Sequence, residues 1–330
     1  MSGAETRLWV VSDGRTGHEN LALGVAETLG LKPEIKRVRT DGFWASLAPF
    51  GPPPPGSVGK SGSVAAPPWP ALVIGVGRCA MPYLTAIRKE SGGASFVMAL
   101  QNPVASPKNF DLVWAPAHDQ LEGDNVITSI TGPHRLSPQA VAAAGADYAK
   151  QLAGFPEKKV AVLLGGPTPA FRFGEMEARL LCAQLDQLGQ DIGFLITTSR
   201  RTPKEVTDVV RAWANARKAK FWSGEEGPNP YLGFLGVADA IVVTSDSANM
   251  LGEAASTGKP IYVFQAPEKD LKRAAKFARL HDAIQSAGAS RRLMGALDSW
   301  TYEPLDANRF IAAALRSRLA ERGVSLPGAV

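Results

Sequence analysis

Five polar segments carry the residues that could do chemistry, and the first spans residues 12–20. It reads Ser-Asp-Gly-Arg-Thr-Gly-His-Glu-Asn and follows a short apolar run. Asp13 and His18 can move protons near neutral pH, and the glycines allow tight turns and a close approach of a ligand to the backbone. The alternative is that Asp13 and Thr16 only form a turn and a helix cap. We predict that Gly14, Arg15, Thr16 and Gly17 of this loop lie on the acceptor side of a site, the side that binds the substrate to which a group is transferred.

Two segments in the second half combine glycines, hydroxyl groups and arginines. Gly165-Gly166 suits a loop whose amides cradle phosphate, although a simple tight turn explains it equally well. Arg200 and Arg201 stand beside hydroxyl residues and can clamp a diphosphate, because a guanidinium binds phosphate oxygens in a bidentate manner. Pro203 at the first position of the next helix, with Thr202 as a cap candidate, accounts for part of this segment structurally.

The segment from Thr244 to Glu253 runs from an apolar stretch onto a helix. Ser245 and Ser247 can donate to phosphate at the helix start, and Glu253 is spaced to share a side with Asn249. A carboxylate there could accept both hydroxyls of a ribose. Serine and aspartate at a helix start are also ordinary capping residues. The predicted nucleotide-diphosphate site consists of Gly165, Gly166, Ser199, Arg200, Arg201, Ser245, Ser247, Asn249 and Glu253.

The fifth segment pairs Gln101-Asn102-Pro103 with His118-Asp119. Asn102 and His118 follow strand candidates and are predicted to be on the acceptor side, although an ordinary loop role explains them as well. No Asp-x-Asp motif occurs, and the only two cysteines, Cys79 and Cys182, lie far apart without metal-site spacing. The sequence therefore predicts no metal and no cofactor other than a nucleotide-sugar substrate, and it favours a reducing compartment.

Length and charge bound the class of protein. At 330 residues the chain is longer than the usual domain, which predicts two domains. A formal net charge of +5 favours anionic partners such as phosphates, nucleotides or acidic lipid headgroups, although mild basicity is also common without them. The start of the chain lacks a signal-peptide pattern, and no apolar stretch approaches the roughly 20 residues that span a bilayer. We therefore expect a cytoplasmic protein that is at most peripheral on a membrane, with no nucleic-acid partner.

Short apolar runs alternate with helix-period segments along the whole chain, which predicts parallel sheets covered by helices on both faces. The strand candidates are residues 8–12, 34–39, 72–76, 95–100, 112–115, 126–130, 159–164, 192–197, 220–223, 240–244 and 260–264. The helix candidates are residues 19–29, 80–89, 138–152, 175–188, 204–215, 248–256, 269–287 and 305–321. This pattern predicts two Rossmann-like doubly wound α/β domains, and the resemblance described below implies a GT-B-like arrangement in which they face a cleft. We place them at 1–155 and 156–330, with the last helix crossing back to the first domain.

A proline-rich stretch at residues 40–70 interrupts the pattern and predicts a surface loop. It contains Phe43, Trp44, Leu47 and Phe50 and follows the basic residues Lys36, Arg37 and Arg39. These side chains could form an apolar tip with a cationic rim that docks on an anionic membrane surface. The alternative is that the aromatic rings are tucked beneath the loop.

Two resemblances connect these segments. Gly14-Arg15-Thr16-Gly17-His18 is similar to the Gly-Gly-Thr-Gly-Gly-His loop of the N-acetylglucosaminyltransferase that makes lipid II, with Arg15 in place of a glycine. The stretch from Ala238 to Pro260 resembles the donor segment of that enzyme, with Asp246 where its small-residue phosphate turn begins. The resemblance implies that Glu253 contacts the ribose and that His18 lies in the catalytic site.

The second resemblance spans nearly the whole chain and is to the mitochondrial-fission "elongated mitochondria" family, which includes bacterial proteins of unassigned activity. Residues 12–20, 198–203, 244–247 and 257–260 carry it. Plant members are implicated in recruiting a dynamin-related protein to mitochondria. The resemblance therefore implies either a transferase with a GT-B body or an adaptor that has lost catalysis.

Two function classes follow. The first is a metal-independent glycosyltransferase that uses a nucleotide diphosphate-sugar, with a membrane or envelope component as acceptor and Asp13 or His18 as base. The second is a membrane-associated scaffold without catalysis. A sugar-nucleotide epimerase that binds a dinucleotide is disfavoured, because neither its glycine fingerprint nor a Tyr-x-x-x-Lys pair is present.

Overall fold

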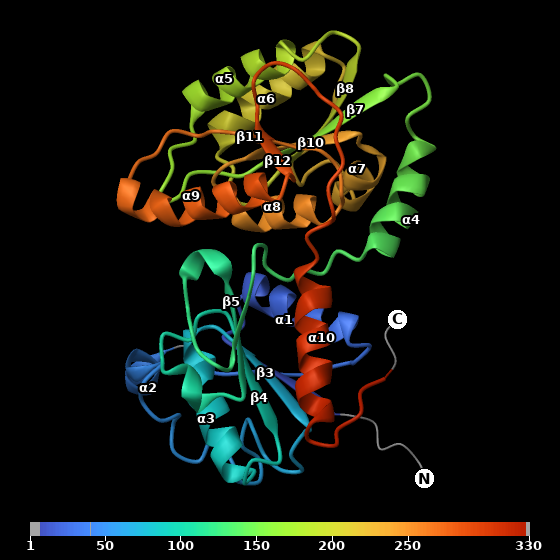
Figure 1. The fold of residues 1–330 in the computed structure, drawn as a ribbon. Helices are drawn as coiled ribbons and strands as arrows, with labels where there is room; N and C mark the ends of the chain where they lie inside the picture. Colours follow the sequence, from blue (N-terminus) through green and yellow to red (C-terminus); the bar gives the residue numbers. More distant parts are fainter. Residues whose placement is uncertain (1–6, 40, 328–330) are drawn as a thin grey trace. The chain divides into compact units, whose positions relative to one another are not determined.

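The computed structural model describes residues 7–39 and 41–327, which fold as two compact units (Figure 1). Unit 1 comprises Met1–Arg135 together with Asp306–Val330, and unit 2 comprises Leu136–Leu305. The predicted boundary at residue 155 differs from this division. Helix α4 (Pro138–Ala149) packs against α7 (Tyr231–Val237) of unit 2, where a Cβ on Gly145 would lie 2.8 Å from Gly236 Cα. That close approach assigns α4 to the second unit.

Unit 1 contains a six-stranded parallel sheet in the order β2-β1-β3-β4-β5-β6. Its strands are β1 (Leu8–Ser12), β2 (Glu34–Arg37), β3 (Leu72–Val76), β4 (Phe96–Leu100), β5 (Leu112–Pro116) and β6 (Val126–Ser129). Its helices are α1 (Thr16–Thr28), α2 (Gly42–Leu47), α3 (Met81–Glu90) and α10 (Ala307–Ala320), with 3-10 turns at Arg78–Ala80, Pro107–Asn109 and Ala117–Asp119.

The two faces of this sheet are covered by different helices, and β1 shows why. Successive side chains of a strand point to opposite faces. Leu8 and Val10 accordingly belong to the cluster with α1 and α10, whereas Trp9 and Val11 belong to the cluster with α3. The chain thus returns to unit 1 at its end, where α10 completes the core.

Unit 2 contains a second six-stranded parallel sheet, in the order β12-β11-β10-β7-β8-β9. Its strands are β7 (Lys158–Leu164), β8 (Ile192–Thr198), β9 (Lys220–Trp222), β10 (Ala240–Thr244), β11 (Ile261–Phe264) and β12 (Ser290–Arg292). Helices α5 (Glu175–Asp186), α6 (Lys204–Ala216), α8 (Ala248–Ala255) and α9 (Leu271–Ser286) join α4 and α7 around it.

All eleven predicted strands are present within two residues of their predicted ends. The sequence missed β12, because its Ser-Arg-Arg run has no apolar character. It also missed α7, and it missed α2 inside the predicted loop 40–70. The rest of that loop packs on unit 1: Trp69 lies edge-on to Trp9 at 5.9 Å between ring centroids, and a bridge joins Val58 to Ala65.

Candidate functional site

Each sheet has a point where the order of its strands reverses, and ligands of doubly wound folds bind beside such points, at the carboxyl ends of the strands. In unit 1 this point lies between β1 and β3, and in unit 2 it lies between β7 and β10. The predicted loop 12–20 continues β1, while the segments at Gly165 and Ser245 continue β7 and β10. Topology therefore places three of the five predicted segments at switch points.

The site in unit 1 is centred on an Asp-His pair. His18 Nδ1 lies 2.9 and 3.0 Å from the two carboxylate oxygens of Asp13. Beneath them Gly77, which follows β3 with φ +88°, approaches so closely that a Cβ would lie 2.7 Å from Asp13 Oδ2. The carboxylate fixes the imidazole with Nδ1 toward the aspartate, which leaves Nε2 as the nitrogen able to take a proton.

A second network, which the sequence reasoning missed, supports this loop. Glu19 is 7% exposed, accepts from Ser12 Oγ at 2.8 Å and receives two bonds from Arg37, at 2.8 and 3.1 Å. The Arg37 side chain holds the pKa of Glu19 below its usual range despite burial. Ser12 Oγ also accepts from the Gly14 amide at 2.8 Å. The loop between β1 and α1 is thus anchored by a buried carboxylate seven residues from Ser12.

The remaining acceptor-side residues are arranged differently. Gly14 has a φ of +77°, a backbone conformation that favours glycine. The Arg15 amide donates to Asp13 Oδ1 at 3.2 Å, so Asp13 stabilises a turn as well as binding His18. Thr16 opens α1 but is not its cap, because Arg15 holds that position and makes no side-chain cap bond. Asn102 caps its own turn through the Val104 amide, and His118 lies 3.8 Å from Asp119.

Asn102 and His118 follow β4 and β5, the strands beyond β3 in the sheet. Among the described residues, no hydrogen bond or ion pair is found that joins either of them to Asp13 or His18. The structure thus brings Asp13, Gly14, Arg15 and His18 together and leaves the Asn102 and His118 loops further along the same edge.

In unit 2 the two glycines have a different use from the predicted phosphate cradle. The Gly165 amide donates to Thr244 Oγ1 at 2.8 Å, and the Gly166 amide donates to Asp246 Oδ2 at 2.9 Å. A Cβ at either position would lie 2.1 Å from a neighbour, Asp246 Oδ2 for Gly165 and the Arg201 carbonyl for Gly166. Because both amides are engaged, the glycines serve to join β7 closely to β10.

The two adjacent arginines are also unlike each other. Arg201 donates to Asp246 Oδ2 at 3.0 Å and to the Gly166 carbonyl at 3.2 Å, so it neutralises a carboxylate whose side chain is fully buried. Arg200 is exposed and makes no hydrogen bond or ion pair with any residue of the described chain. Of the predicted guanidinium pair, Arg200 alone is available to a diphosphate.

The hydroxyl groups separate in the same way. Ser245 is buried and its Oγ accepts from the Ala266 amide at 3.0 Å, while Ser199 Oγ lies 3.1 Å from Thr202 Oγ1. Ser247 precedes α8 without forming a side-chain cap. Asn249 is exposed in the first turn of that helix. Of the predicted site residues in unit 2, Ser247, Asn249 and Arg200 thus remain without side-chain partners in the described structure, and Ser247 is 7% exposed.

Glu253 is partly buried in α8 and accepts from the Tyr231 hydroxyl at 2.5 Å. Desolvation raises the pKa of Glu253 to about 6, against the opposing effect of the Tyr231 bond. The sequence did not identify Tyr231, because it lies in the unpredicted α7. Nearby Lys259 donates to the carbonyls of Leu235 and Gly236 at 2.6 and 2.7 Å, so this cation binds the last carbonyls of α7.

A further histidine, His281 of α9, lies behind the β10 loop. Burial lowers its pKa, while the backbone of Ser245 and the charges of Asp282 and Asp246 act in the opposite direction. Its Nε2 is buried without a hydrogen-bond partner, as is Asp246 Oδ1. The sequence predicts only that His281 lies in a helix, and nothing in it indicates that His281 is close to Ser245 and Asp246.

Neither a metal-binding cluster nor a membrane-spanning helix is found among the described residues. No group of three or more His, Cys, Asp or Glu side chains could hold a metal ion in this part of the chain. None of the helices between residues 7 and 327 is both long enough and apolar enough to cross a membrane.

Two doubly wound units of six parallel strands, each with loops at its switch point, define a GT-B-like protein. A model of the mitochondrial fission ELM1 family matches residues 16–319, and the chain belongs to this family. It is 30% identical over 285 residues to "Mitochondrial fission protein ELM1" of Arabidopsis thaliana, covering 78% of this chain and 66% of that protein. Over 163 residues it is 30% identical to "Uncharacterized protein RP120" of Rickettsia prowazekii (strain Madrid E), covering 48% and 46%. The chain spans less than two thirds of the length of either relative.

Solved structures confirm the predicted fold class. The S. aureus MnaA structure with UDP matches with a TM-score of 0.51 and 12% identity, over 98% of this chain and 100% of that one. A UDP-GlcNAc 2-epimerase from Neisseria meningitidis, bound to UDP-GlcNAc, matches with a TM-score of 0.50 and 13% identity, over 94% and 99%. At these identities the likeness establishes the fold alone. An epimerase also has this fold, so the missing dinucleotide fingerprint does not by itself exclude epimerases.

Proposed function

We propose that this protein is a glycosyltransferase that takes a sugar from a nucleotide diphosphate-sugar, with the donor on unit 2 and the base on unit 1. The observation that carries the proposal is the Asp13-His18 pair above Gly77 at the switch point of unit 1. A histidine held at Nδ1 by a carboxylate is a general base whose Nε2 is ready to accept a proton. The contact supports a role for each residue, in which Asp13 positions the imidazole and His18 accepts the proton.

The donor would use the groups of unit 2 that have no internal partners. Ser247 and the start of α8 offer hydrogen bonds to the diphosphate, and Arg200 adds a positive charge. Glu253 would accept ribose hydroxyls beside Tyr231. Support for a nucleotide comes from the solved structures of this fold, which hold UDP and UDP-GlcNAc.

The reaction would proceed by inversion. The acceptor hydroxyl oxygen attacks the anomeric carbon as His18 Nε2 takes its proton. The bond from that carbon to the diphosphate oxygen breaks, and its electron pair leaves with the nucleoside diphosphate. Arg200 and the N-terminus of α8 would stabilise this developing charge without a metal.

Calorimetric titration with UDP, GDP and ADP tests the donor site directly. We expect one of them to bind, with affinity about tenfold weaker in Arg200→Ala. Heat from none of the three, or binding that Glu253→Ala and Arg200→Ala leave unchanged, would contradict the proposal. Lys204→Ala, whose side chain pairs with Asp208 on the surface of α6, is the control for a general loss of positive charge.

Product analysis separates transfer from epimerisation. The protein is incubated with UDP-GlcNAc, and the nucleotide products are resolved by chromatography with and without candidate acceptors. Acceptor-dependent release of UDP supports transfer. Conversion to the C2 epimer without an acceptor would instead identify an epimerase.

Family membership favours a second function, that of a peripheral membrane adaptor without catalysis. Its supporting observation is that Phe43 and Phe50 are 68% and 75% exposed. These two rings are therefore not buried beneath the loop, as the alternative expected. Of the predicted cationic rim, Lys36 pairs with Glu34 and Arg37 pairs with Glu19, so only Arg39 has no ion-pair partner in the described chain. An adaptor of this kind should float with anionic liposomes and lose flotation in Trp44→Ala, without binding any nucleotide.

A further inference from the structure

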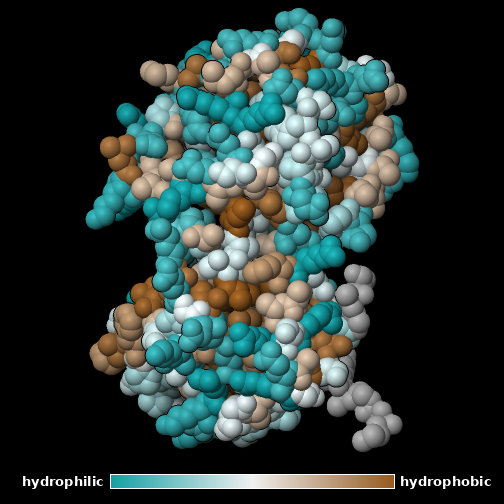
Figure 2. All heavy atoms as spheres, viewed as in Figure 1, coloured by the Kyte–Doolittle hydropathy of each residue, from teal (hydrophilic) through white to brown (hydrophobic). Residues whose placement is uncertain are grey.

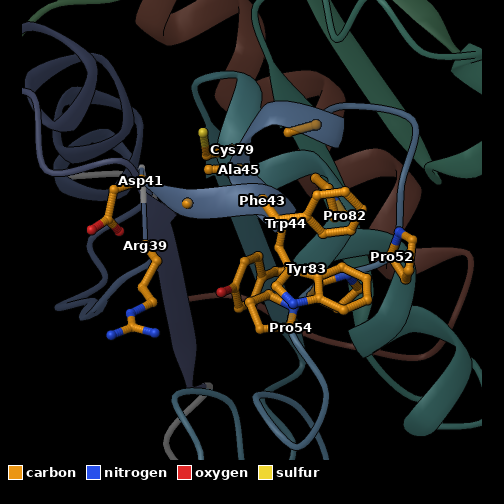
Figure 3. A pocket seen from close by; sticks show the side chains of 13 residues that line it. Arg39, Asp41, Phe43, Trp44, Ala45, Pro52, Pro54, Cys79, Pro82 and Tyr83 are labelled. Carbon is orange, nitrogen blue, oxygen red and sulfur yellow. The ribbon is translucent and has the colours of Figure 1, made fainter.

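An apolar groove runs along α3 of unit 1 and has no role in the chemistry above. Its first part, about 220 Å³, is formed by aromatic rings and prolines around Trp44 and Tyr83 (Figure 3). Its second part, about 610 Å³, extends past Phe50 to Ala86 on α3. Both parts are lined by Pro52, Pro53, Pro54 and Pro82. The two parts thus share these prolines as a common wall, and we call them together the α3 groove.

The apolar surface of this groove continues onto its rim. Phe43 is 68% exposed and Phe50 is 75% exposed, and each belongs to one of the two parts. Figure 2 shows hydrophobic atoms gathered at the edge of unit 1 that α2 occupies in Figure 1. A contiguous apolar surface with a groove is typical of a binding site, because water is expelled when an apolar ligand covers it.

The turn after β3 connects the groove to the Asp13-His18 pair. Its walls come from the segments after β2 and β3, which are the two neighbours of β1 in the sheet. Gly77 touches Asp13 and His18, and Cys79 two residues later lines the groove. Between them Arg78 donates to the carbonyls of Ala48 and Ala45, at 2.8 and 3.2 Å, and so fixes α2 against this turn. One short turn thus contacts the proposed base at Gly77 and lines the groove at Cys79.

The charged side chains of the groove lie at its two ends, with Arg39 and Asp41 in the first part and Lys89 and Glu90 in the second. Arg39 lines the end that follows β2, and it has no ion-pair partner within the described structure. Asp41 lies on the same wall, and Figure 3 shows both side chains at the end opposite Pro52. The stretch between the two ends is lined mainly by prolines and other apolar side chains, with Thr85, Ser106 and Asn109 as its polar members. The arrangement suits an apolar chain with an anionic head beside Arg39.

We propose that the α3 groove binds the apolar chain of a single amphiphilic acceptor, whose anionic headgroup contacts Arg39 and whose reacting hydroxyl reaches His18. This inference rests on the proposed glycosyl transfer and names the class of its acceptor. It assigns to the proline-rich segment a function that the sequence did not indicate: together with α2, it forms one wall of the acceptor groove.

The test uses 11-(dansylamino)undecanoic acid, a fluorescent probe with an undecanoyl chain and a carboxylate. We expect saturable binding with blue-shifted emission. Ala86→Trp, which fills the groove from α3, should weaken binding about tenfold, and Phe50→Ser should weaken it about fivefold. Arg39→Gln should weaken it about threefold and reduce its salt dependence. The matched control is Ala143→Trp on the exposed face of α4 in unit 2, which should bind as the parent protein does.

The outcomes separate this inference from the proposed function. Absence of probe binding, or equal binding by Ala86→Trp and the parent protein with both folded by circular dichroism, overturns the groove proposal even if UDP binds. Probe binding without nucleotide binding overturns the transferase instead. Flotation with phosphatidylglycerol vesicles that needs Phe43 and Phe50 but tolerates Ala86→Trp, without probe binding, identifies a membrane-docking surface and also overturns the groove proposal.

Discussion

Arg201 donates from Nη2 to Oδ2 of Asp246 at 3.0 Å, across the switch point of unit 2. The aspartate side chain is fully buried, whereas the arginine side chain is 43% exposed. The pair therefore links the loop after β8 to the loop after β10 through a charged hydrogen bond. It also offsets a negative charge that would otherwise repel a diphosphate at the neighbouring start of α8.

The first prediction contrasts two adjacent arginines. Arg201→Ala leaves the buried Asp246 carboxylate without its counter-charge and should lower the free energy of unfolding by about 1–3 kcal/mol, below the full cost of a buried pair because Arg201 is partly hydrated. Arg200→Ala removes an exposed side chain without partners and should change stability by less than about 0.5 kcal/mol. Urea denaturation of both variants measures the difference, and equal unfolding midpoints would contradict a stabilising role of the Arg201-Asp246 pair.

The second prediction concerns glycines of the two predicted ligand loops. In Gly166→Ala the new methyl group would lie 2.1 Å from the Arg201 carbonyl, which is backbone and cannot rotate away. We expect the free energy of unfolding to fall by about 1–3 kcal/mol or more. Gly17 has no atom within 4 Å of its Cβ position, so Gly17→Ala should be neutral or up to about 1 kcal/mol stabilising. Thermal unfolding of the two proteins gives the comparison, and a Gly17→Ala variant less stable than Gly166→Ala would refute it.

Much of the fold could be predicted because the buried parts of parallel strands are runs of apolar residues, as in β3, β7 and β10. The edge strand β12 escaped prediction, since its Ser-Arg-Arg sequence contains no apolar side chain. The division at residue 135 escaped as well, because it depends on the fit of Gly145 against Gly236, which are distant in sequence.

The positions of the candidate sites could be predicted from the ends of the strands, but the use of each side chain could not. Ser, Gly and Arg at a strand end suit phosphate binding and internal hydrogen bonding equally. Gly166 and Arg201 turned out to bind Asp246, while Arg200 has no such partner. Which of two neighbouring arginines turns inward depends on the backbone of β8 and β10 together, and spacing along one segment does not contain that information.

The third prediction is a pH dependence at Glu253. Desolvation raises its folded-state pKa from 4.5 to about 6, so between these values the folded protein holds a proton that the unfolded chain has lost. The contribution of Glu253 to stability therefore falls as pH rises from about 4.5 to about 6 and stays low above that. Glu253→Gln keeps an acceptor for Tyr231 and should gain about 1–2 kcal/mol over the parent protein at pH 7. That gain should disappear near pH 4.

Urea titrations of the parent protein and Glu253→Gln at several pH values measure this difference. Glu27→Gln is the control, because that carboxylate is half-exposed and pairs with Arg135 on the surface. A stability difference between Glu253→Gln and the parent protein that is constant from pH 4 to pH 7 would show that Glu253 is not desolvated.

The fourth prediction tests the roles of Asp13 and His18 once a donor and an acceptor are identified. His18→Gln removes the base and should lower kcat by about 10²–10⁴. Asp13→Asn keeps the shape of the side chain but no longer fixes the imidazole with Nε2 free, and should lower kcat by a similar factor. Neither variant should change the affinity for UDP, because the nucleotide contacts are assigned to unit 2. The double variant should be little slower than either single variant, since the two residues act as one unit.

The measurement is steady-state transfer, with UDP affinity by calorimetry for each variant. Glu27→Gln on α1 is the matched control, because it changes a carboxylate of the same helix away from Gly77. If the losses in the two single variants were instead additive in the double variant, Asp13 and His18 would act independently, and Asp13 would have to contact substrate itself. If UDP affinity fell with kcat, the donor would be bound by the loop after β1 rather than by Arg200 and Ser247, and the assignment of the two units would have to be reversed.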